Sequence, residues 1–235
     1  MTEIPLIASL HLIVGATTVM AGAGALVFRK GSLLHRTAGN VFFAAMLALC
    51  TSGLYMSITR SITFTFFLGM LSLYLVLTGW VAALRKDGRI GRFEKAAFMA
   101  ILLNSAALTA LGCVASFGWW NMGDEVPPSA YFVLAGLAAL FAAFDFHAII
   151  RRGLNRKQRV TRHLWRMCFS MFIATSIFFL GNNDLLPDAL RTPLFLNAPI
   201  FAILLAMIFW IFRIQITRPV PVVSDASMLN APQSK

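Results

Sequence analysis

Charged residues are scarce in this sequence. Only 12% of its 235 residues are Asp, Glu, Lys or Arg, whereas a soluble domain usually carries about 25%. Hydrophobic residues make up 59% of the chain, and the mean hydropathy is +0.77. This composition excludes a soluble globular enzyme, because too few charged side chains are present to cover a water-exposed surface. It also excludes a disordered chain, which would be poor in apolar residues.

Cysteine is also scarce, and several familiar catalytic motifs are missing. Cys50, Cys113 and Cys168 lie within apolar segments and cannot all pair, which excludes a disulfide-stapled secreted domain. We interpret all three as small buried hydrophobic side chains. The sequence has no Gly-Lys-Ser/Thr phosphate loop, His-Glu-x-x-His, Gly-x-Ser-x-Gly or Cys-x-x-Cys motif. These absences argue against an NTPase, a zincin protease or a serine hydrolase of familiar type.

Long apolar segments fill the chain instead. Each is about 20 residues long, which is the length of helix that crosses a hydrocarbon core of about 30 Å. The sequence therefore predicts an all-α polytopic membrane protein with seven transmembrane helices, at residues 5–28, 37–58, 61–84, 96–117, 130–150, 163–181 and 195–214. We expect residues 1–218 to form a single transmembrane domain and residues 219–235 to form a flexible cytoplasmic tail.

The basic residues are distributed unevenly along the chain. There are 20 Lys and Arg against 9 Asp and Glu, and all the basic residues except Arg60 and Arg191 follow the first, third, fifth and seventh apolar segments. The positive-inside rule assigns these helix ends to the cytoplasm. We therefore expect the N-terminus outside and the C-terminus in the cytoplasm. The net charge of +11 is then a topology signal that also attracts anionic lipid headgroups, and we expect no nucleic-acid partner.

One carboxylate stands apart from the helix ends. Asp145 is the only charged residue well inside a predicted span, and an intramembrane carboxylate is costly unless it has a partner. We expect it to pair with Arg162 or Arg166, which open the next span. The pair is either a structural lock between the fifth and sixth spans or a gating element.

The chain has only four histidines, and three of them are predicted to lie at the cytoplasmic side. His35 begins the second span, His147 lies near the end of the fifth, and His163 begins the sixth. Three histidines at one depth favour a shared site. His11 is alone in the outer part of the first span.

The first span also carries a narrow face of small side chains. His11 is followed at helical spacing by Gly15, Thr18, Gly22 and Ala25. Such a face is typical of close helix packing. It would also suit a flat groove that admits a planar ligand beside a histidine.

A b-type haem fits this set of residues. It needs two neutral imidazoles at one depth on facing helices, and its propionates lie among cations near the interface. Pairs drawn from His35, His147 and His163 meet the first need, and Arg36 and Arg166 are candidates for the second. His11 has no histidine partner, so a second haem there would need an unusual ligand. We therefore predict a redox-linked membrane protein that binds haem b near the cytoplasmic face, with membrane redox partners or a second copy of itself.

Two other functions stay open. A zinc-dependent membrane hydrolase would use His35, His147 and His163 as metal ligands, although the arginines nearby would repel a dication. A cofactor-free small transporter or accessory membrane subunit would need none of the histidines. In that protein, Asp145 and its arginine partner would serve as a gate or as a purely structural pair.

The first part of the chain combines His11-Leu12, Gly15 and Gly22 with Leu34-His35-Arg36-Thr37-Ala38-Gly39 and Ser52-Gly53, and a looser echo lies in Arg162-His163-Leu164-Trp165-Arg166-Met167. These motifs resemble those of a family of uncharacterised bacterial predicted multi-pass membrane proteins. That family has a His-led first helix followed by Leu-His-Arg-x-x-Gly. The resemblance implies a bacterial inner-membrane location and no particular activity. The histidine pattern is similar, by analogy only, to that of membrane b-type cytochromes.

Overall fold

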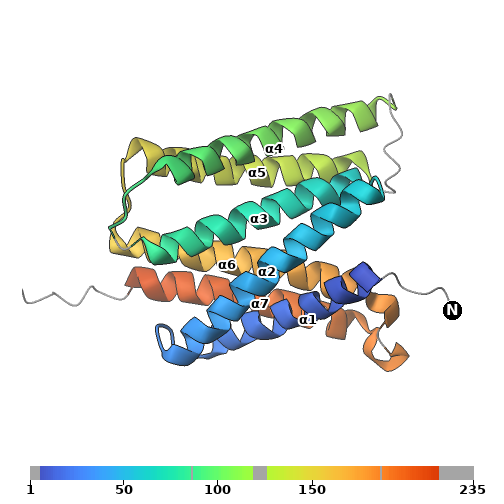
Figure 1. Ribbon diagram of the computed structural model, residues 1–235, viewed down its shortest axis with the longest axis horizontal. Coiled ribbons are helices and arrows are strands. Elements are labelled where there is room, and N and C mark those ends of the chain that lie inside the picture. Colours follow the sequence, from blue (N-terminus) through green and yellow to red (C-terminus); the bar gives the residue numbers. More distant parts are fainter. Residues whose placement is uncertain (1–5, 86, 119–125, 186, 217–235) are drawn as a thin grey trace, which may run out of the picture.

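In the part of the chain that the structure describes, seven long α-helices form a bundle (Figure 1). The computed structural model describes residues 6–85, 87–118, 126–185 and 187–216. Its helices are α1 (Leu6–Val27), α2 (Leu33–Thr59), α3 (Thr63–Leu84), α4 (Arg92–Ser116), α5 (Pro128–Ile150), α6 (Arg156–Leu180) and α7 (Pro193–Ile216), with short 3₁₀ helices η1 (Asn183–Leu185) and η2 (Asp188–Leu190) before α7. All seven α-helices are long and apolar enough to cross a membrane. This confirms the predicted fold class, whereas the predicted tail, residues 219–235, lies outside the described residues.

Three helices begin several residues before the predicted apolar segments, because polar residues cap them. At α2, the Ser32 hydroxyl accepts a hydrogen bond from the backbone N–H of His35 at 3.2 Å. At α6, Asn155 and Gln158 form a reciprocal capping box, in which each side chain accepts from the other's backbone N–H. At α4, the Glu94 carboxylate accepts a hydrogen bond from the backbone N–H of Gly91 at 2.8 Å. Each cap satisfies backbone N–H groups that have no partner within the helix.

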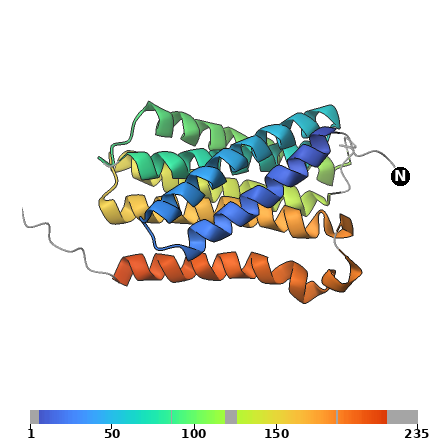
Figure 2. The ribbon, with the colours of Figure 1, turned by 60° about the horizontal axis from the view of Figure 1, so that its bottom comes forward.

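Helices α3 and α6 pack against each other in the middle of the bundle. The α4–α5 hairpin covers one side of this pair, and α1, α2 and α7 lie on the other (Figures 1 and 2). Gly79 permits the close approach of α3 to α6, since a Cβ atom at this position would lie 3.1 Å from the Cβ of Arg166. The central helices therefore reach both halves of the bundle.

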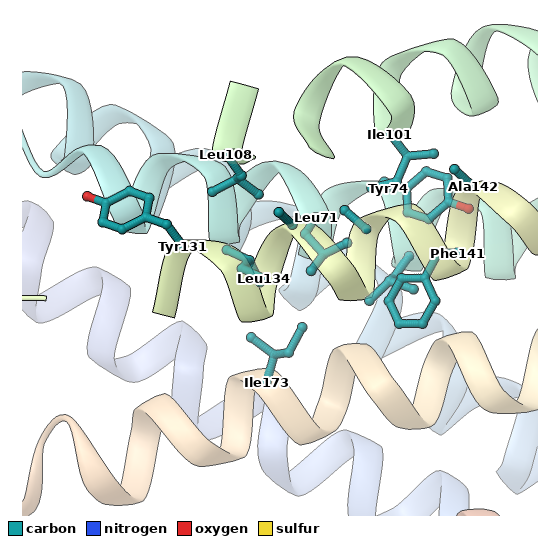
Figure 3. Close-up of a cluster of buried hydrophobic side chains, with 12 residues drawn as sticks. Leu71, Tyr74, Ile101, Leu108, Tyr131, Leu134, Phe141, Ala142 and Ile173 are labelled. Carbon is teal, nitrogen blue, oxygen red and sulfur yellow. The ribbon is translucent and has the colours of Figure 1, made fainter. Parts of the chain in front are cut away.

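Two clusters of buried apolar side chains hold these halves together. One lies between α3, α4, α5 and α6 and includes Leu71, Leu108 and Phe141 (Figure 3). The other joins α2, α3, α6 and α7 and contains Cys50 and Cys168. Both of these cysteines are buried as expected. Cys113, in contrast, is exposed on α4, so the prediction of burial is wrong for it. Lipid is as apolar as the bundle interior, and an apolar segment does not reveal which of its faces points inward.

The basic loops gather at one end of the bundle, which we call the basic end. It includes loop residues 28–32, 87–91 and 151–155, the last turn of α7 and the adjoining turns of the other helices (Figure 1). Leu154 donates its N–H to the carbonyl of Gly88 at 2.9 Å and so ties two of these loops together. Gly88 has φ +67°, and a Cβ atom there would lie 2.0 Å from the Leu154 oxygen. Only glycine fits this contact. The side of a membrane that this end faces stays a prediction.

Candidate functional site

His35 is held at the basic end by the start of α2. Its ring Nδ1 lies 2.9 Å from the carbonyl oxygen of Ala25, in the last turns of α1. A carbonyl can only accept a hydrogen bond, so Nδ1 carries the proton. In the neutral ring, Nε2 then keeps its lone pair.

His163 is held in the same way, by a different pair of helices. Its Nδ1 lies 2.9 Å from the carbonyl oxygen of Gly79, so α3 fixes a ring that belongs to α6. Within the described residues, neither His35 nor His163 has a hydrogen-bond partner on Nε2. Histidines that bind a metal typically donate the other ring N–H to a carbonyl or carboxylate, which fixes the tautomer and the ring orientation.

Both imidazoles line one cavity of about 450 Å³, which we call the histidine cavity. The volume lies within the usual range of about 300 to 1,000 Å³ for cofactor and ligand sites. Small residues keep the α1 and α2 walls open, and most of the remaining lining is apolar or aromatic. The small residues are Gly22, Ala25 and Gly39. The apolar and aromatic residues include Phe42, Trp80, Met167, Met171 and Trp210. The cavity is therefore an apolar slot with two imidazoles in its walls.

Two cations, Lys30 and Arg36, also line the histidine cavity and come from its basic end. The Lys30 ammonium donates to the carbonyl oxygens of Ala25 and Leu26 at 2.8 and 2.6 Å, and it lies 4.7 Å from the centre of the Trp210 ring. Burial lowers the pKa of the Lys30 ammonium. An anionic group beside it would favour the charged form again.

The small face of α1 packs closely against α6 and also lines a cavity. Gly22 is in tight contact, since a Cβ atom there would lie 2.6 Å from the Met171 sulfur on α6. The same Gly22, with Ala25, also lines the histidine cavity. Close packing and an open groove therefore occur on one helix face.

His147 and Arg166 lie outside the histidine cavity. His147 is exposed on α5, and Arg166 is committed to an ion pair with Asp145. Of the three pairs that the sequence allowed, the structure brings together His35 and His163. The described residues contain no group of three or more His, Cys, Asp or Glu side chains that could hold a metal ion. The zinc hypothesis therefore has no ligand set within them.

His11 lies at the opposite end of the bundle. Its Nδ1 is 2.8 Å from the Ser52 hydroxyl, which itself donates to the Ala48 carbonyl at 2.7 Å. The hydroxyl therefore accepts from the ring, and Nε2 of His11 keeps its lone pair. His11 lines a separate cavity of about 270 Å³ in which no second histidine takes part.

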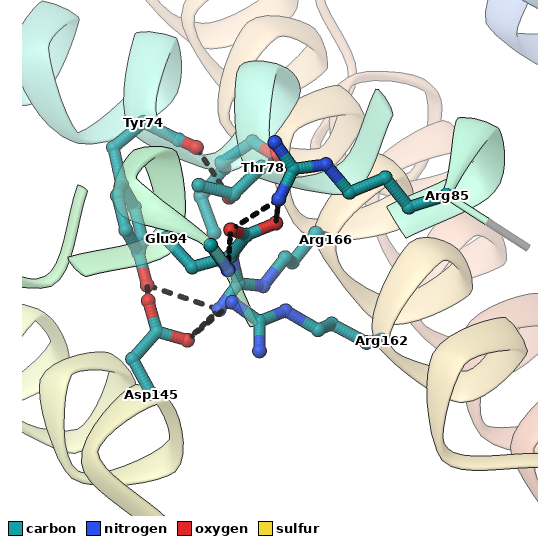
Figure 4. Close-up of polar contacts among 9 residues, drawn as sticks. Tyr74, Thr78, Arg85, Glu94, Asp145, Arg162 and Arg166 are labelled. Carbon is teal, nitrogen blue, oxygen red and sulfur yellow. Dashed lines mark hydrogen bonds and ion pairs between the residues drawn. The ribbon is translucent and has the colours of Figure 1, made fainter. Parts of the chain in front are cut away.

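Asp145 lies in a buried cluster of charges near the basic end (Figure 4). Its Oδ1 is 2.9 Å from Nη2 of Arg162 and also forms an ion pair with Nη2 of Arg166, and Asp145 and Arg166 are each 1% exposed. The carboxylate thus pairs with both of the arginines that the sequence offered. Because the two arginines stand one turn apart on α6, a single carboxylate on α5 reaches both.

Sequence reasoning did not identify Tyr74 and Glu94 as parts of this region. The Tyr74 hydroxyl on α3 donates to Oδ2 of Asp145 at 2.7 Å and accepts from Arg166 at 3.0 Å. Glu94 pairs with Arg85 at 2.6 Å and caps α4 through the Gly91 N–H at 2.8 Å. The position of Glu94 in the first turn after a glycine could have indicated a helix cap, since acidic residues are favoured there. Tyr74 gives no such signal, since a tyrosine in an apolar span is an ordinary core residue.

Comparisons of this chain with models of known protein families, with curated proteins and with solved structures gave no match. The resemblance stated for the histidine and glycine motifs therefore stays a prediction. The function has to be argued from the geometry of the cavities and of the charged cluster.

Proposed function

We propose that this integral membrane protein binds haem b in the histidine cavity, with His35 and His163 as the axial ligands, and that it works in electron transfer. The observation that carries the proposal is the fixed tautomer of both rings. Each donates Nδ1–H to a backbone carbonyl and lines one apolar cavity of about 450 Å³ with Nε2 still available. Two neutral imidazoles are suitable ligands for a b-type haem.

The rest of the lining supports the same cofactor. The aromatic and methionine side chains and the small residues of α1 and α2 suit a large flat apolar ring. Lys30 and Arg36 stand at the basic end, where carboxylate substituents of the ring would meet cations. Arg166 is not available to bind these carboxylates, because its guanidinium is already paired with Asp145. A bound haem would supply one-electron chemistry, and the chain would supply the ligands, an apolar surrounding and two cations.

The proposal includes a location and an orientation. The basic end faces the cytoplasm of a bacterial inner membrane, so the cofactor lies near the cytoplasmic face. A cofactor-free transporter or accessory subunit is the competing function. A cofactor-free function gives no reason for the imidazoles of His35 and His163, on different helices, to have the same tautomer in one cavity.

The experiment is a reduced-minus-oxidised absorption spectrum of the full chain, purified in detergent after expression with added haem. We expect a sharp α band and about one haem per chain. His35→Ala and His163→Ala should lose the haem. His147→Ala is the matched control and should keep it, because His147 is also at the basic end but does not line the histidine cavity.

A colourless wild-type protein would refute the proposal, and so would unchanged haem content and spectrum in both alanine variants. His163→Met guards against variants that lose haem only because they misfold. Methionine keeps an axial donor, so this variant should retain haem with a higher reduction potential. Circular dichroism of each variant shows whether the bundle has formed.

A further inference from the structure

A second cavity lies at the basic end, between α5, α6 and the last turn of α7. Its volume is about 220 Å³, and it shares no lining residue with the histidine cavity. We call it the arginine cavity, because Arg151, Arg162 and Arg166 line it together with Asp145. The haem proposal uses none of these residues.

The charges in the arginine cavity do not balance. Three guanidinium groups line it, and the one carboxylate, Asp145, already accepts hydrogen bonds or ion pairs from Arg162, Arg166 and Tyr74. Glu94 does not line this cavity and is paired with Arg85. The cavity is therefore positive, and its described lining has no second carboxylate to neutralise the remaining charge.

Two N–H donor groups of Arg166 have no hydrogen-bond partner in the part of the chain that the structure describes. Its side chain is 1% exposed, and its Nη2 is used by Asp145 and Tyr74. Its Nε and Nη1 are buried and have no hydrogen-bond partner within the described residues. Buried N–H groups of native proteins nearly always have a partner, and those of a charged group are the most costly to leave unpaired. Each of these N–H groups belongs to a charged guanidinium and can donate a charge-assisted hydrogen bond to an oxygen of phosphate.

We propose that the arginine cavity binds a phosphate-bearing anion, with Arg166 as the buried anchor and with Arg151 and Arg162 beside it. Either an anionic lipid headgroup or free phosphate supplies the required oxygens. The cavity reaches the outside of the bundle beside Phe144, a large exposed apolar side chain of α5. A basic pocket between transmembrane helices at headgroup level is the kind of site that binds anionic lipids.

The test uses the full chain, freed of lipid in a neutral detergent. Thermal unfolding is followed by tryptophan fluorescence while phosphatidylglycerol, phosphatidylcholine or inorganic phosphate is added at constant ionic strength. A ligand that binds only the folded protein raises the midpoint with concentration, which gives an apparent Kd. Arg166→Lys keeps the charge but removes the unpartnered Nε and Nη1 donors. Arg151→Gln removes an exposed cation from the lining, and Arg156→Gln removes an exposed cation that is outside it.

We expect phosphatidylglycerol or phosphate to raise the midpoint more than phosphatidylcholine does. Arg166→Lys should weaken the apparent Kd about tenfold or more, Arg151→Gln should weaken it a few-fold, and Arg156→Gln should leave it unchanged. A response to phosphatidylglycerol alone identifies a headgroup site, and a response to inorganic phosphate identifies a site for the free anion.

The proposal is overturned if neither ligand raises the midpoint. It is also overturned if Arg151→Gln and Arg156→Gln bind as tightly as each other. If Arg166→Lys does not fold, the comparison of these two exposed variants decides the question.

Discussion

Replacing Asp145 by asparagine should destabilise the bundle more than any surface substitution. Asp145→Asn keeps the shape of the side chain and removes its charge. In the native protein, this 1% exposed carboxylate forms ion pairs with Arg162 and Arg166 and accepts a hydrogen bond from Tyr74 at 2.7 Å. In the variant, two buried guanidinium groups one helical turn apart would face each other without a counter-charge.

The expected loss is about 3 to 5 kcal/mol of unfolding free energy, which is the usual cost of removing one partner of a buried ion pair. Because domains are stable by only about 5 to 15 kcal/mol, this is a large share of the total. Arg162→Gln in the same chain should recover part of the loss, since it removes one of the uncompensated charges.

The assay is reversible unfolding in mixed micelles, followed by circular dichroism. Asp188→Asn is the matched control. Asp188 also pairs with an arginine, Arg191, at 3.0 Å, but it is highly exposed, and surface pairs contribute little. If Asp145→Asn lowers the unfolding free energy no more than Asp188→Asn does, the buried cluster is not the lock between α3, α5 and α6 that we infer.

Three further predictions follow from contacts in the structure. Gly79→Val should lower the unfolding free energy by about 1 to 3 kcal/mol, because the larger side chain forces α3 away from α6. Gly136→Ala should be neutral or stabilising in the same unfolding assay, because a Cβ atom at Gly136 would meet no other atom within 4 Å. Gly88→Ala should lower the thermal midpoint more than Gly31→Ala, because both have positive φ but only Gly88 touches a facing loop. His11→Ala should leave the haem content unchanged, because His11 lines a different cavity; a drop measured by haem extraction would indicate a second haem.

The apolar segments alone were enough to predict the seven helices. A run of about 20 apolar residues has few alternatives to a membrane-spanning helix, because lipid offers no partner for backbone polar groups. Helix ends were harder to place, since capping by Ser32 or Asn155 depends on the conformation of one residue. The partners of Asp145 could also be predicted from the sequence, because a carboxylate in an apolar span requires a nearby cation.

The roles of the histidines could not be predicted from the sequence alone. Asp145 and His147 are two residues apart on α5, so they point about 200° apart and only one of them can face the bundle. The sequence does not say which one does, and the structure turns Asp145 inward and leaves His147 exposed. Arg166 could have served a cofactor or Asp145, and the rotation of α6 commits it to Asp145.

The pattern of residues along the chain is enough to predict the number of helices, the end at which the cations gather and the need of Asp145 for a cation. These follow from local composition, which acts through the free energy of burying each segment in lipid. The same pattern does not predict that His35 and His163 share a cavity or that Tyr74 completes the Asp145 cluster, and both follow from the packed bundle. Those contacts depend on how each helix is rotated about its axis and on which helices are neighbours. Packing between segments far apart in the chain fixes both, and no short stretch of sequence encodes them.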